Sequence, residues 1–201
     1  MEIALGLPEE ARRAAAELYW EAFERELTPV VGGPHAVDTI ADGLHLDRVI
    51  GAWDGGELLG IAAVRDRSGP VLEWDARRLR RDFGPLRGLW RTVLSTMLDA
   101  KARPGELLLD SLAVSSAARG KGVGTKLLQA TVDEARRRGL RRVRLEVVDT
   151  NPRARALYER FGFRWDRTER TPYLRKLMGF SSVDDLVLDV RADRANAPRP
   201  S

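Results

Sequence analysis

The fold is decided by a stretch near the middle of the chain, between Leu107 and Phe163. It reads LLLDSLAV (107–114), SSAARGKGVG (115–124), TKLLQATVDEARRRG (125–139), LRRVRLEVV (140–148) and DTNPRARALYERFGF (149–163). The first block is a short apolar run typical of a strand, and residues 142–148 alternate like a second strand. Between them, residues 125–138 follow a helical pattern that places five side chains on a single face: Leu127, Leu128, Thr131, Val132 and Ala135. A helical crossover of this length predicts parallel strands, so the stretch is a β-α-β unit.

The turn that opens this helix is rich in glycine, with Gly120, Gly122 and Gly124 within five positions. Glycine costs about 1 kcal/mol relative to alanine inside a helix, so its repetition indicates that something approaches the bare backbone. A helix N-terminus offers unpaired N–H groups and the positive end of the dipole. Lys121 and Lys126 add charge beside it. The turn therefore predicts a binding site for a phosphate or pyrophosphate.

Two common nucleotide loops fit this turn poorly. The dinucleotide-binding fingerprint needs a third small residue after G-x-G-x-x, but Gly120 and Gly122 lead to Thr125. A Walker loop ends in Gly-Lys-Ser/Thr, whereas the order here is Gly124, Thr125, Lys126.

The pattern Arg-x-x-Gly-x-Gly, at Arg119, Gly122 and Gly124, resembles the acetyl-coenzyme A loop of the GNAT superfamily of N-acetyltransferases. Downstream, a second set resembles that family's N-x-x-A-x-x-L-Y-x-x-x-G-F segment: Asn151, Ala154, Leu157, Tyr158, Phe161, Gly162 and Phe163. The two motifs are separated by the expected helix and strand. The resemblance implies a GNAT-like mixed α/β fold and an acetyl-coenzyme A-dependent acetyl transfer to an amine.

The resemblance also implies roles for individual residues. Cofactor contacts fall on Leu112, Ala113, Val114, Arg119, Gly120, Lys121, Gly122, Val123, Gly124, Thr125, Lys126 and Asn151. Main-chain groups near residues 112–114 would hold the pantetheine arm, and one N–H would polarise the thioester carbonyl. The Tyr158 hydroxyl would protonate the departing thiolate.

Two of these residues have structural alternatives. Asn151 directly precedes Pro152, so it is also a suitable helix N-cap, and the two roles can coexist. Tyr158 shares a helical face with Ala154 and Phe161, so its ring could simply pack in the core.

Two carboxylates are candidates for the general base, which family members often carry on these strands. An amine with a pKa near ~10 is mostly protonated at neutral pH and must lose a proton before attack. Simple alternation puts Asp110 on the side of Leu108, Leu112 and Val114, where a lone carboxylate is costly unless partnered. Glu146 alternates out of the apolar face of the second strand. We rank Asp110 ahead of Glu146.

Composition excludes several other classes. The 201 residues are 43% apolar and 32% charged, which suits one soluble domain with a sizeable core. The net charge of +4 and arginine runs such as 136–138 could bind nucleic acid, but no aromatic residues interleave them. The chain has no cysteine, and its two histidines lack acidic partners at ligand spacing, so we expect no disulfide and no metal. No stretch approaches the ~18 apolar residues that span a bilayer, so we expect a cytoplasmic protein without a membrane partner.

The remaining elements are predicted from local patterns. Residues 2–7, 48–53, 58–65, 164–170 and 183–190 are expected strands, and helices are expected from Pro8 to Phe23 and over 37–44. Asp54, Gly55 and Gly56 predict a hairpin turn. Proline and glycine in 29–34 are expected to end the first helix. With the central unit, these give a mixed sheet of six to seven strands within one domain, residues 1–191.

Two segments depart from the family's minimal pattern. An insertion of about residues 70–104 predicts two helical pieces broken at Gly84 and Pro85, with an apolar stripe that includes Leu79, Phe83, Leu86, Leu89, Trp90, Val93, Leu94, Met97 and Leu98. We expect this stripe to pack as core or interface, and a lid over the acceptor site is the alternative. Residues 171–182 form a second candidate acceptor loop. Residues 192–201, with two prolines, predict a disordered tail.

The sequence leaves the acceptor open among small amines, antibiotics, polyamines, peptide N-termini and lysine side chains. Another acyl donor, a hydroxyl acceptor, or a coenzyme A-binding regulatory module without catalysis are alternatives. Either a monomer or a homodimer is compatible with the sequence.

Overall fold

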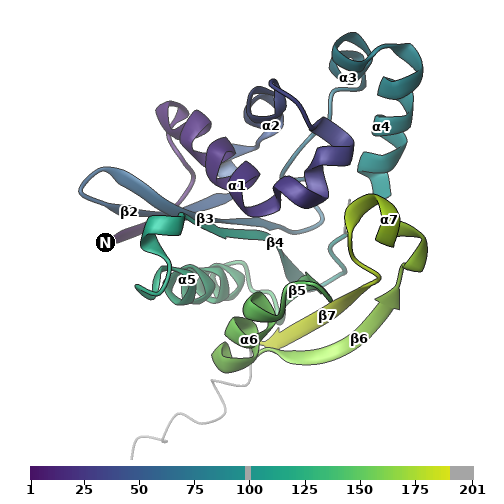
Figure 1. The fold of residues 1–201 in the computed structure, drawn as a ribbon. Helices are drawn as coiled ribbons and strands as arrows, with labels where there is room; N and C mark the ends of the chain where they lie inside the picture. The colour runs from purple at the N-terminus through teal and green to yellow at the C-terminus, as the bar shows by residue number, and fades with distance from the viewer. Residues whose placement is uncertain (98–100, 191–201) are drawn as a thin grey trace, which may run out of the picture.

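The computed structural model describes residues 1–97 and 101–190, which form a seven-stranded sheet in the order β1-β2-β3-β4-β5-β7-β6 (Figure 1). Its strands are β1 (Glu2–Leu5), β2 (Val49–Asp54), β3 (Glu57–Arg65), β4 (Glu106–Val114), β5 (Arg142–Val148), β6 (Arg164–Arg170) and β7 (Ser182–Asp189). Neighbouring strands are antiparallel except β4 and β5, which are parallel. The mixed α/β fold predicted from the sequence is confirmed.

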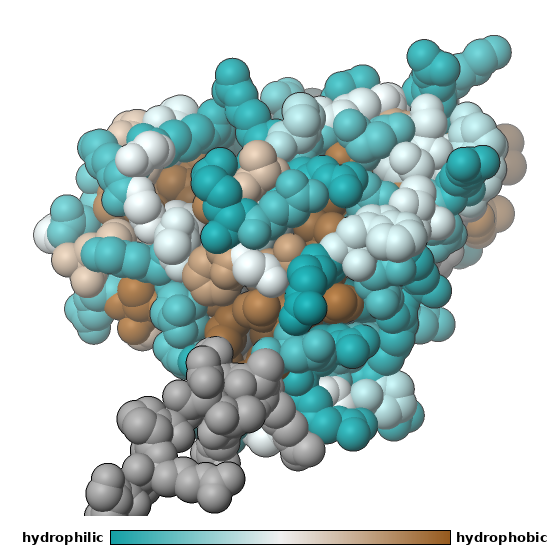
Figure 2. Space-filling view, turned by 90° about the horizontal axis from the view of Figure 1, so that it is seen from below, coloured by the Kyte–Doolittle hydropathy of each residue, from teal (hydrophilic) through white to brown (hydrophobic). Residues whose placement is uncertain are grey.

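Helices cover both faces of the sheet (Figure 1). They are α1 (Arg12–Val31), α2 (Ala36–Gly43), α3 (Ala76–Phe83), α4 (Pro85–Met97), α5 (Val123–Arg137), α6 (Pro152–Phe161) and α7 (Arg175–Met178). Helices α1 to α4 lie above the sheet in the view of Figure 1, and α5 and α6 lie below it. Two apolar cores result, one on each face. Seen from below, the surface is mostly hydrophilic, with hydrophobic side chains gathered near its middle (Figure 2).

The predicted β-α-β unit is confirmed as β4, α5 and β5, with Glu106–Leu109 paired to Arg142–Leu145. Helix α5 begins at Val123, two residues before the predicted start, because Gly122 serves as its N-cap in the left-handed conformation with φ of 79°. The helical face predicted to pack is buried, including Leu127 and Leu128, which have no exposed surface.

Strand β4 contains a β-bulge that simple alternation does not predict. Ala63 of β3 pairs with Ser111 and Val64 pairs with Leu109, so Asp110 is the extra residue. As a result Leu109 and Leu112 both join the core against α5, although they are three apart. Asp110 therefore does not share a side with Leu112 and Val114, contrary to the expectation, and instead faces the opposite side of the sheet. Bulges commonly redirect a side chain next to a functional site.

The hairpin between β2 and β3 confirms its predicted turn. Gly55 and Gly56 are the two loop residues, with φ of 56° and 86°. Positive φ at both positions is the geometry of the two-residue turn that matches the twist of antiparallel strands.

The first helix begins later than predicted and ends within residues 29–34, as predicted. Helix α1 continues past Pro29 to Val31, with a non-helical backbone at Phe23. Pro29 removes one hydrogen bond, but Leu27, Val30 and Val31 are buried and hold the last turn against the core. Pro8 lies just before a short 3-10 turn, Glu9–Ala11, rather than inside the helix.

The C-terminal elements also differ in detail from the predictions. Residues 171–182, predicted as a loop, contain a 3-10 turn at Pro172–Leu174 and helix α7. Strand β7 covers Ser182–Asp189, one residue earlier than predicted. The predicted tail of residues 192–201 lies outside the described residues.

The insertion between β3 and β4 forms two helices, α3 and α4, that meet at Gly84 with φ of 82°. Leu79 and Leu94 are buried, as predicted. Leu86, Leu89, Trp90 and Val93 are not, with exposed fractions of 82%, 47%, 58% and 49%. The expectation of core packing is therefore wrong for these four residues, the alternative that they form an interface remains a prediction, and Leu98 lies outside the described residues.

Two substitutions on α4 test this orientation. Leu94→Ala should lower the free energy of unfolding by about 2–5 kcal/mol, because it leaves a cavity in the core. Leu86→Ala should change it by no more than about 0.5 kcal/mol, because the side chain is in solvent. Urea unfolding of both variants measures the difference. Similar losses would show that Leu86 also packs.

Candidate active site

The glycine turn before α5 has two glycines that need their conformational freedom. Gly120 and Gly122 have φ of 77° and 79°, and a Cβ atom on either would meet nothing within 4 Å. Gly124 is different, because its Cβ would lie 3.2 Å from Leu157, so it allows α5 to pack closely on α6. The open space above Gly120 and Gly122 suits the close approach of a ligand to the backbone.

Hydrogen-bond donors and positive charge surround this space. Within the described chain, no backbone carbonyl accepts from the N–H groups of Val123, Gly124 and Thr125, the first residues of α5. Lys121 and Lys126 are exposed beside them. Arg119 is already engaged, since its Nη2 donates to Glu21 at 3.0 Å and its Nε to the Val114 carbonyl at 3.3 Å. The residues present fit an anionic phosphate group, with Arg119 shared between it and α1.

Strands β4 and β5 separate next to this turn. Their pairing ends at Leu109 and Leu145, although β4 continues to Val114 and β5 to Val148. Residues 112–114 pair with β3 on their other edge. The main-chain groups of β4 that face β5 are therefore free of strand pairing over this stretch, and a ligand could hydrogen-bond to them.

Two residues of the downstream motif have predicted roles: Tyr158 lies on α6, and Asn151 caps that helix. Asn151 Oδ1 accepts from the Ala154 N–H at 3.1 Å, which confirms the N-cap. Tyr158 is 8% exposed and packs edge-on against Phe163. Burial raises the pKa of Tyr158 to about 12, so its hydroxyl stays protonated at neutral pH. Contact of Asn151 with a cofactor remains a prediction.

The two candidate carboxylates meet in one cavity of about 810 Å³ on the α1 side of the sheet. Asp110 enters it from β4 and Glu146 from β5, at the point where the strands separate. Aromatic side chains from three segments line the same cavity: Tyr19, Phe23, Tyr173 and Phe180. Residues 171–182 thus contribute a wall of this cavity, and their role as an acceptor loop remains a prediction. Tyr158 is not among the residues that line it.

The Asp110 side chain is held in place by Arg65 of β3, on the face of the sheet that α1 covers. Arg65 Nε lies 3.1 Å from Asp110 Oδ1, and both side chains are largely buried. Tyr19 lines the same cavity as Asp110, and burial and then the negative charge of Asp110 raise the pKa of its hydroxyl. A smaller cavity of about 260 Å³ shares Tyr19, Leu27 and Asp110 and extends under α4 to Thr92 and Ser95. The insertion therefore lines a chamber next to the candidate site.

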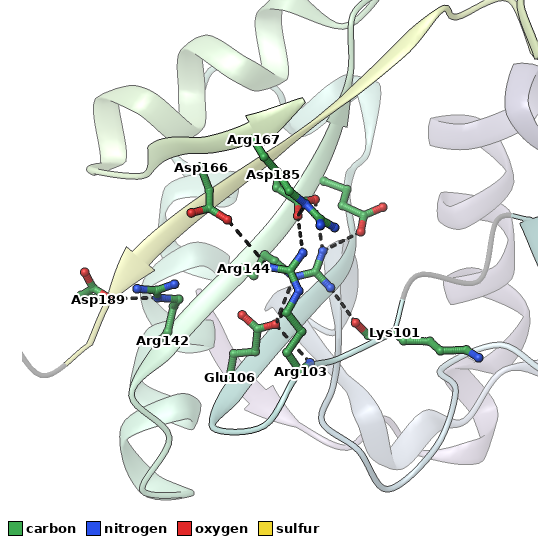
Figure 3. A network of polar contacts seen from close by, with 10 residues as sticks. Lys101, Arg103, Glu106, Arg142, Arg144, Asp166, Arg167, Asp185 and Asp189 are labelled. Atoms are coloured by element: carbon green, nitrogen blue, oxygen red, sulfur yellow. Dashed lines mark hydrogen bonds and ion pairs between the residues drawn. The ribbon is translucent and has the colours of Figure 1, made fainter. Parts of the chain in front are cut away.

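Glu146 is held by Arg144, the centre of a buried ionic network (Figure 3). The Arg144 side chain is 2% exposed and contacts three carboxylates. Its N–H groups donate to Glu106 at 3.2 Å, to Glu146 at 2.6 Å and to Asp185 at 3.2 Å. A further N–H donates to the Lys101 carbonyl at 2.7 Å. One guanidinium thus links β4, β5, β7 and the segment that enters β4.

Two more arginines close the network. Arg103 Nη2 donates to Asp185 at 2.7 Å, and Arg167 Nε donates to the same carboxylate at 2.8 Å. Burial alone would lower the pKa of Arg144, but the hydrogen bond and charge of Glu146, with the charges of Asp185 and Glu106, raise it. Because every charge has an opposite neighbour, the network can stay ionised although it is largely buried. It fixes the floor of the cavity.

Sequence reasoning did not identify Arg144, Glu106, Asp185, Arg65 or Tyr19. A signal was available for Arg144, because a strand buried beside a parallel neighbour rarely carries charge, and Arg144 and Glu146 lie two residues apart on one face. No local sequence pattern indicated the partners of Arg144, which come from distant segments of the chain.

Residues 1–97 and 101–190 contain neither a preformed metal site nor a helix that could span a membrane. No group of three or more His, Asp or Glu side chains there is arranged to hold a metal ion. No helix in this part of the chain is long and apolar enough to cross a membrane.

Comparison with known proteins assigns the family. The model of the Acetyltransferase (GNAT) family matches residues 12–163, which is most of the chain. The chain belongs to the GNAT acetyltransferase family.

Solved structures share the fold at low sequence identity. An N-acetyltransferase from Staphylococcus aureus matches over 94% of this chain and 100% of its own, with a TM-score of 0.66 and 17% identity. The Salmonella typhimurium protein yncA, solved with its cofactor acetyl-CoA, has a TM-score of 0.64 and 18% identity over 100% of this chain and 98% of its own.

Curated relatives match over a shorter segment. A probable N-acetyltransferase, camello, from Xenopus tropicalis is 44% identical over 69 residues, 34% of this chain and 32% of its own. A mycothiol acetyltransferase from Beutenbergia cavernae is 45% identical over 62 residues, 31% of this chain and 20% of its own. The matched segments thus cover only a fifth to a third of these relatives.

Two arginines of β5 test the buried network. Arg144→Met should lower the free energy of unfolding by about 3–5 kcal/mol, because three carboxylates lose their shared partner. Arg142→Met removes an exposed pair with Asp189 and should cost less than about 1 kcal/mol. Urea unfolding at neutral pH measures both. Equal small losses would show that the network contributes little to stability.

Proposed function

We propose that this protein transfers an acetyl group from acetyl-coenzyme A to a primary amine by direct attack within a ternary complex. The observation that carries the proposal is that three features of the structure lie close together. The glycine turn, the separated edges of β4 and β5, and the cavity with Asp110 and Glu146 all meet along one seam of the sheet. Family membership supports acetyl transfer, and the amine acceptor is our inference.

Coenzyme A would bind below and along this seam. The N–H groups of residues 122–125, with Lys121, Lys126 and Arg119, would hold its pyrophosphate. Unpaired main-chain groups at Leu112, Ala113 and Val114 would hold its pantetheine arm, and one N–H would hydrogen-bond to the thioester oxygen. Bound acetyl-coenzyme A supplies the acyl group as a reactive thioester. Asn151 lies at the start of α6, beside the end of β5.

The acceptor would enter the cavity on the opposite face of the sheet, where Asp110 or Glu146 takes the proton that the amine must lose. Asp110 has its position fixed by Arg65, and Glu146 has its position fixed by Arg144. Glu146 keeps more access to solvent, with 35% of its side chain exposed against 16% for Asp110. Both are placed to accept a proton directly or through water.

Tyr158 would act as the general acid. Its raised pKa keeps the proton on the hydroxyl at neutral pH, which is the state needed to protonate a departing thiolate. We expect the protein to act in the cytoplasm, as a monomer or homodimer, without a metal.

Release of free thiol from acetyl-coenzyme A in the presence of a panel of amines tests the proposal. Amine-dependent release supports it. Release only with alcohols, or only with other acyl-coenzyme A donors, would point to the alternative acyltransferases. Tight coenzyme A binding with no release for any acceptor would favour a regulatory module.

Gly122 and Gly139 form a matched pair for the cofactor site. Both have positive φ, 79° and 67°, and open space at the position of a Cβ. Alanine at either should cost about 1–2 kcal/mol of folding stability. Gly122→Ala should also weaken coenzyme A binding by about tenfold or more, because it obstructs charge-assisted hydrogen bonds to the pyrophosphate. Calorimetry with coenzyme A measures this, and unchanged affinity in a folded Gly122→Ala protein would remove the turn from the cofactor site.

Tyr158→Phe separates catalysis from packing, because phenylalanine keeps the ring and its contact with Phe163. The single-turnover rate should fall by about 10² to 10⁴, with coenzyme A affinity unchanged, since only the proton donor is lost. In the wild-type protein, the raised pKa means that ionisation of this tyrosine should not reduce the rate below about pH 10. Full activity of a folded Tyr158→Phe protein would return the residue to a packing role.

A further inference from the structure

Helix α4 turns an apolar ridge toward solvent. The ridge consists of Leu86, Leu89, Trp90 and Val93, which follow one face of the helix. Figure 1 shows α3 and α4 at the margin of the molecule, above the sheet and beyond α1 and α2. An exposed apolar patch on one element indicates an interaction surface.

The opposite face of α4 explains why the ridge points outward. A Cβ on Gly88 would lie 2.4 Å from the Arg80 Cα, so only glycine allows this face to pack on α3. Leu94 is buried on the protein side, and Thr92 and Ser95 donate to carbonyls of their own helix. The Arg91 guanidinium lies 3.8 Å from the centre of the Phe83 ring. These contacts fix the rotation of α4 and leave Leu86 and Trp90 more than half exposed, at 82% and 58%.

The same two helices are strongly basic. They carry six arginines, Arg77, Arg78, Arg80, Arg81, Arg87 and Arg91, against a single carboxylate, Asp82. Asp42 and Asp82 neutralise Arg78. Arg80 and Arg87 are exposed and have no acidic partner among the described residues. Six arginines less one carboxylate give these two helices a formal charge of +5, against +4 for the whole chain, and Arg87 directly follows Leu86 of the ridge.

The combination of exposed apolar side chains and arginines on α3 and α4 identifies the class of partner. Leucine and valine side chains have no role in binding phosphates of nucleic acid. Pairing with a second copy would bring the arginines of both copies together, and like charges across an interface oppose association. An anionic lipid surface needs only shallow insertion of Trp and Leu side chains with arginines at the headgroups.

We propose that α3 and α4 bind the surface of an anionic lipid bilayer, with the ridge inserted among the headgroups. No membrane-spanning helix is required, so the absence of one in the described residues is compatible with this mode of binding. The proposal revises the expectation that the protein has no membrane partner. It is independent of the acetyl transfer proposed above.

Vesicle flotation tests the proposal with the full chain. The protein should float with vesicles of phosphatidylglycerol and phosphatidylcholine at low salt, and not with phosphatidylcholine alone. Raising the ionic strength should release it, because the arginine contribution is screened. No binding to the anionic vesicles would overturn the proposal. Equal binding to both lipid compositions would overturn the role of the arginines.

Trp90 and Trp165 provide a matched pair of variants, because their exposed fractions are 58% and 57%. Trp90→Ala should reduce partitioning onto anionic vesicles by about tenfold, the effect of removing one large apolar side chain. Trp165→Ala, on β6, should leave it unchanged. Thermal unfolding verifies that both variants fold. Equal effects of the two substitutions, or a ridge-dependent dimer without lipid binding, would overturn the proposal.

Discussion

The short parallel pairing of β4 with β5 is the constraint on which the rest of the structure depends. Only four residues of each strand pair, from Glu106 and Arg142 to Leu109 and Leu145. Beyond them the strands part, so the sheet has unpaired backbone groups at its centre rather than at an edge. Such groups must be satisfied by a ligand or water, which makes this seam the natural place for a binding site.

The seam is held together at one end by charge. Arg144 joins Glu106, Glu146 and Asp185 across three strands where the pairing is intact. Buried ion pairs contribute little net stability, but removal of one partner is costly, so they favour a single geometry. Here that geometry directs Glu146 into the cavity on the α1 side of the sheet. On β4, the bulge and Arg65 direct Asp110 into the same space.

The insertion shows how one segment can serve two surfaces. The inner side of α4 lines the small chamber beside Asp110 through Thr92 and Ser95, while its outer side carries the apolar ridge. Gly88 makes this arrangement possible, because close contact with α3 fixes the rotation of the helix. Anything that binds the ridge would therefore lie one helix away from the chamber beside Asp110.

The sequence by itself determined the β-α-β unit, the glycine turn, the hairpin at Gly55 and Gly56, and the family. These depend on local periodicity and on backbone conformations that only glycine adopts readily. Tertiary structure alone decided where the side chains point. The bulge at Asp110 reverses the alternation of β4, and the partners of Arg144 come from segments up to 43 residues away. The orientation of α4 likewise depends on its contact with α3. A strand register or a helix rotation is set by long-range packing, which no local pattern of apolar residues encodes.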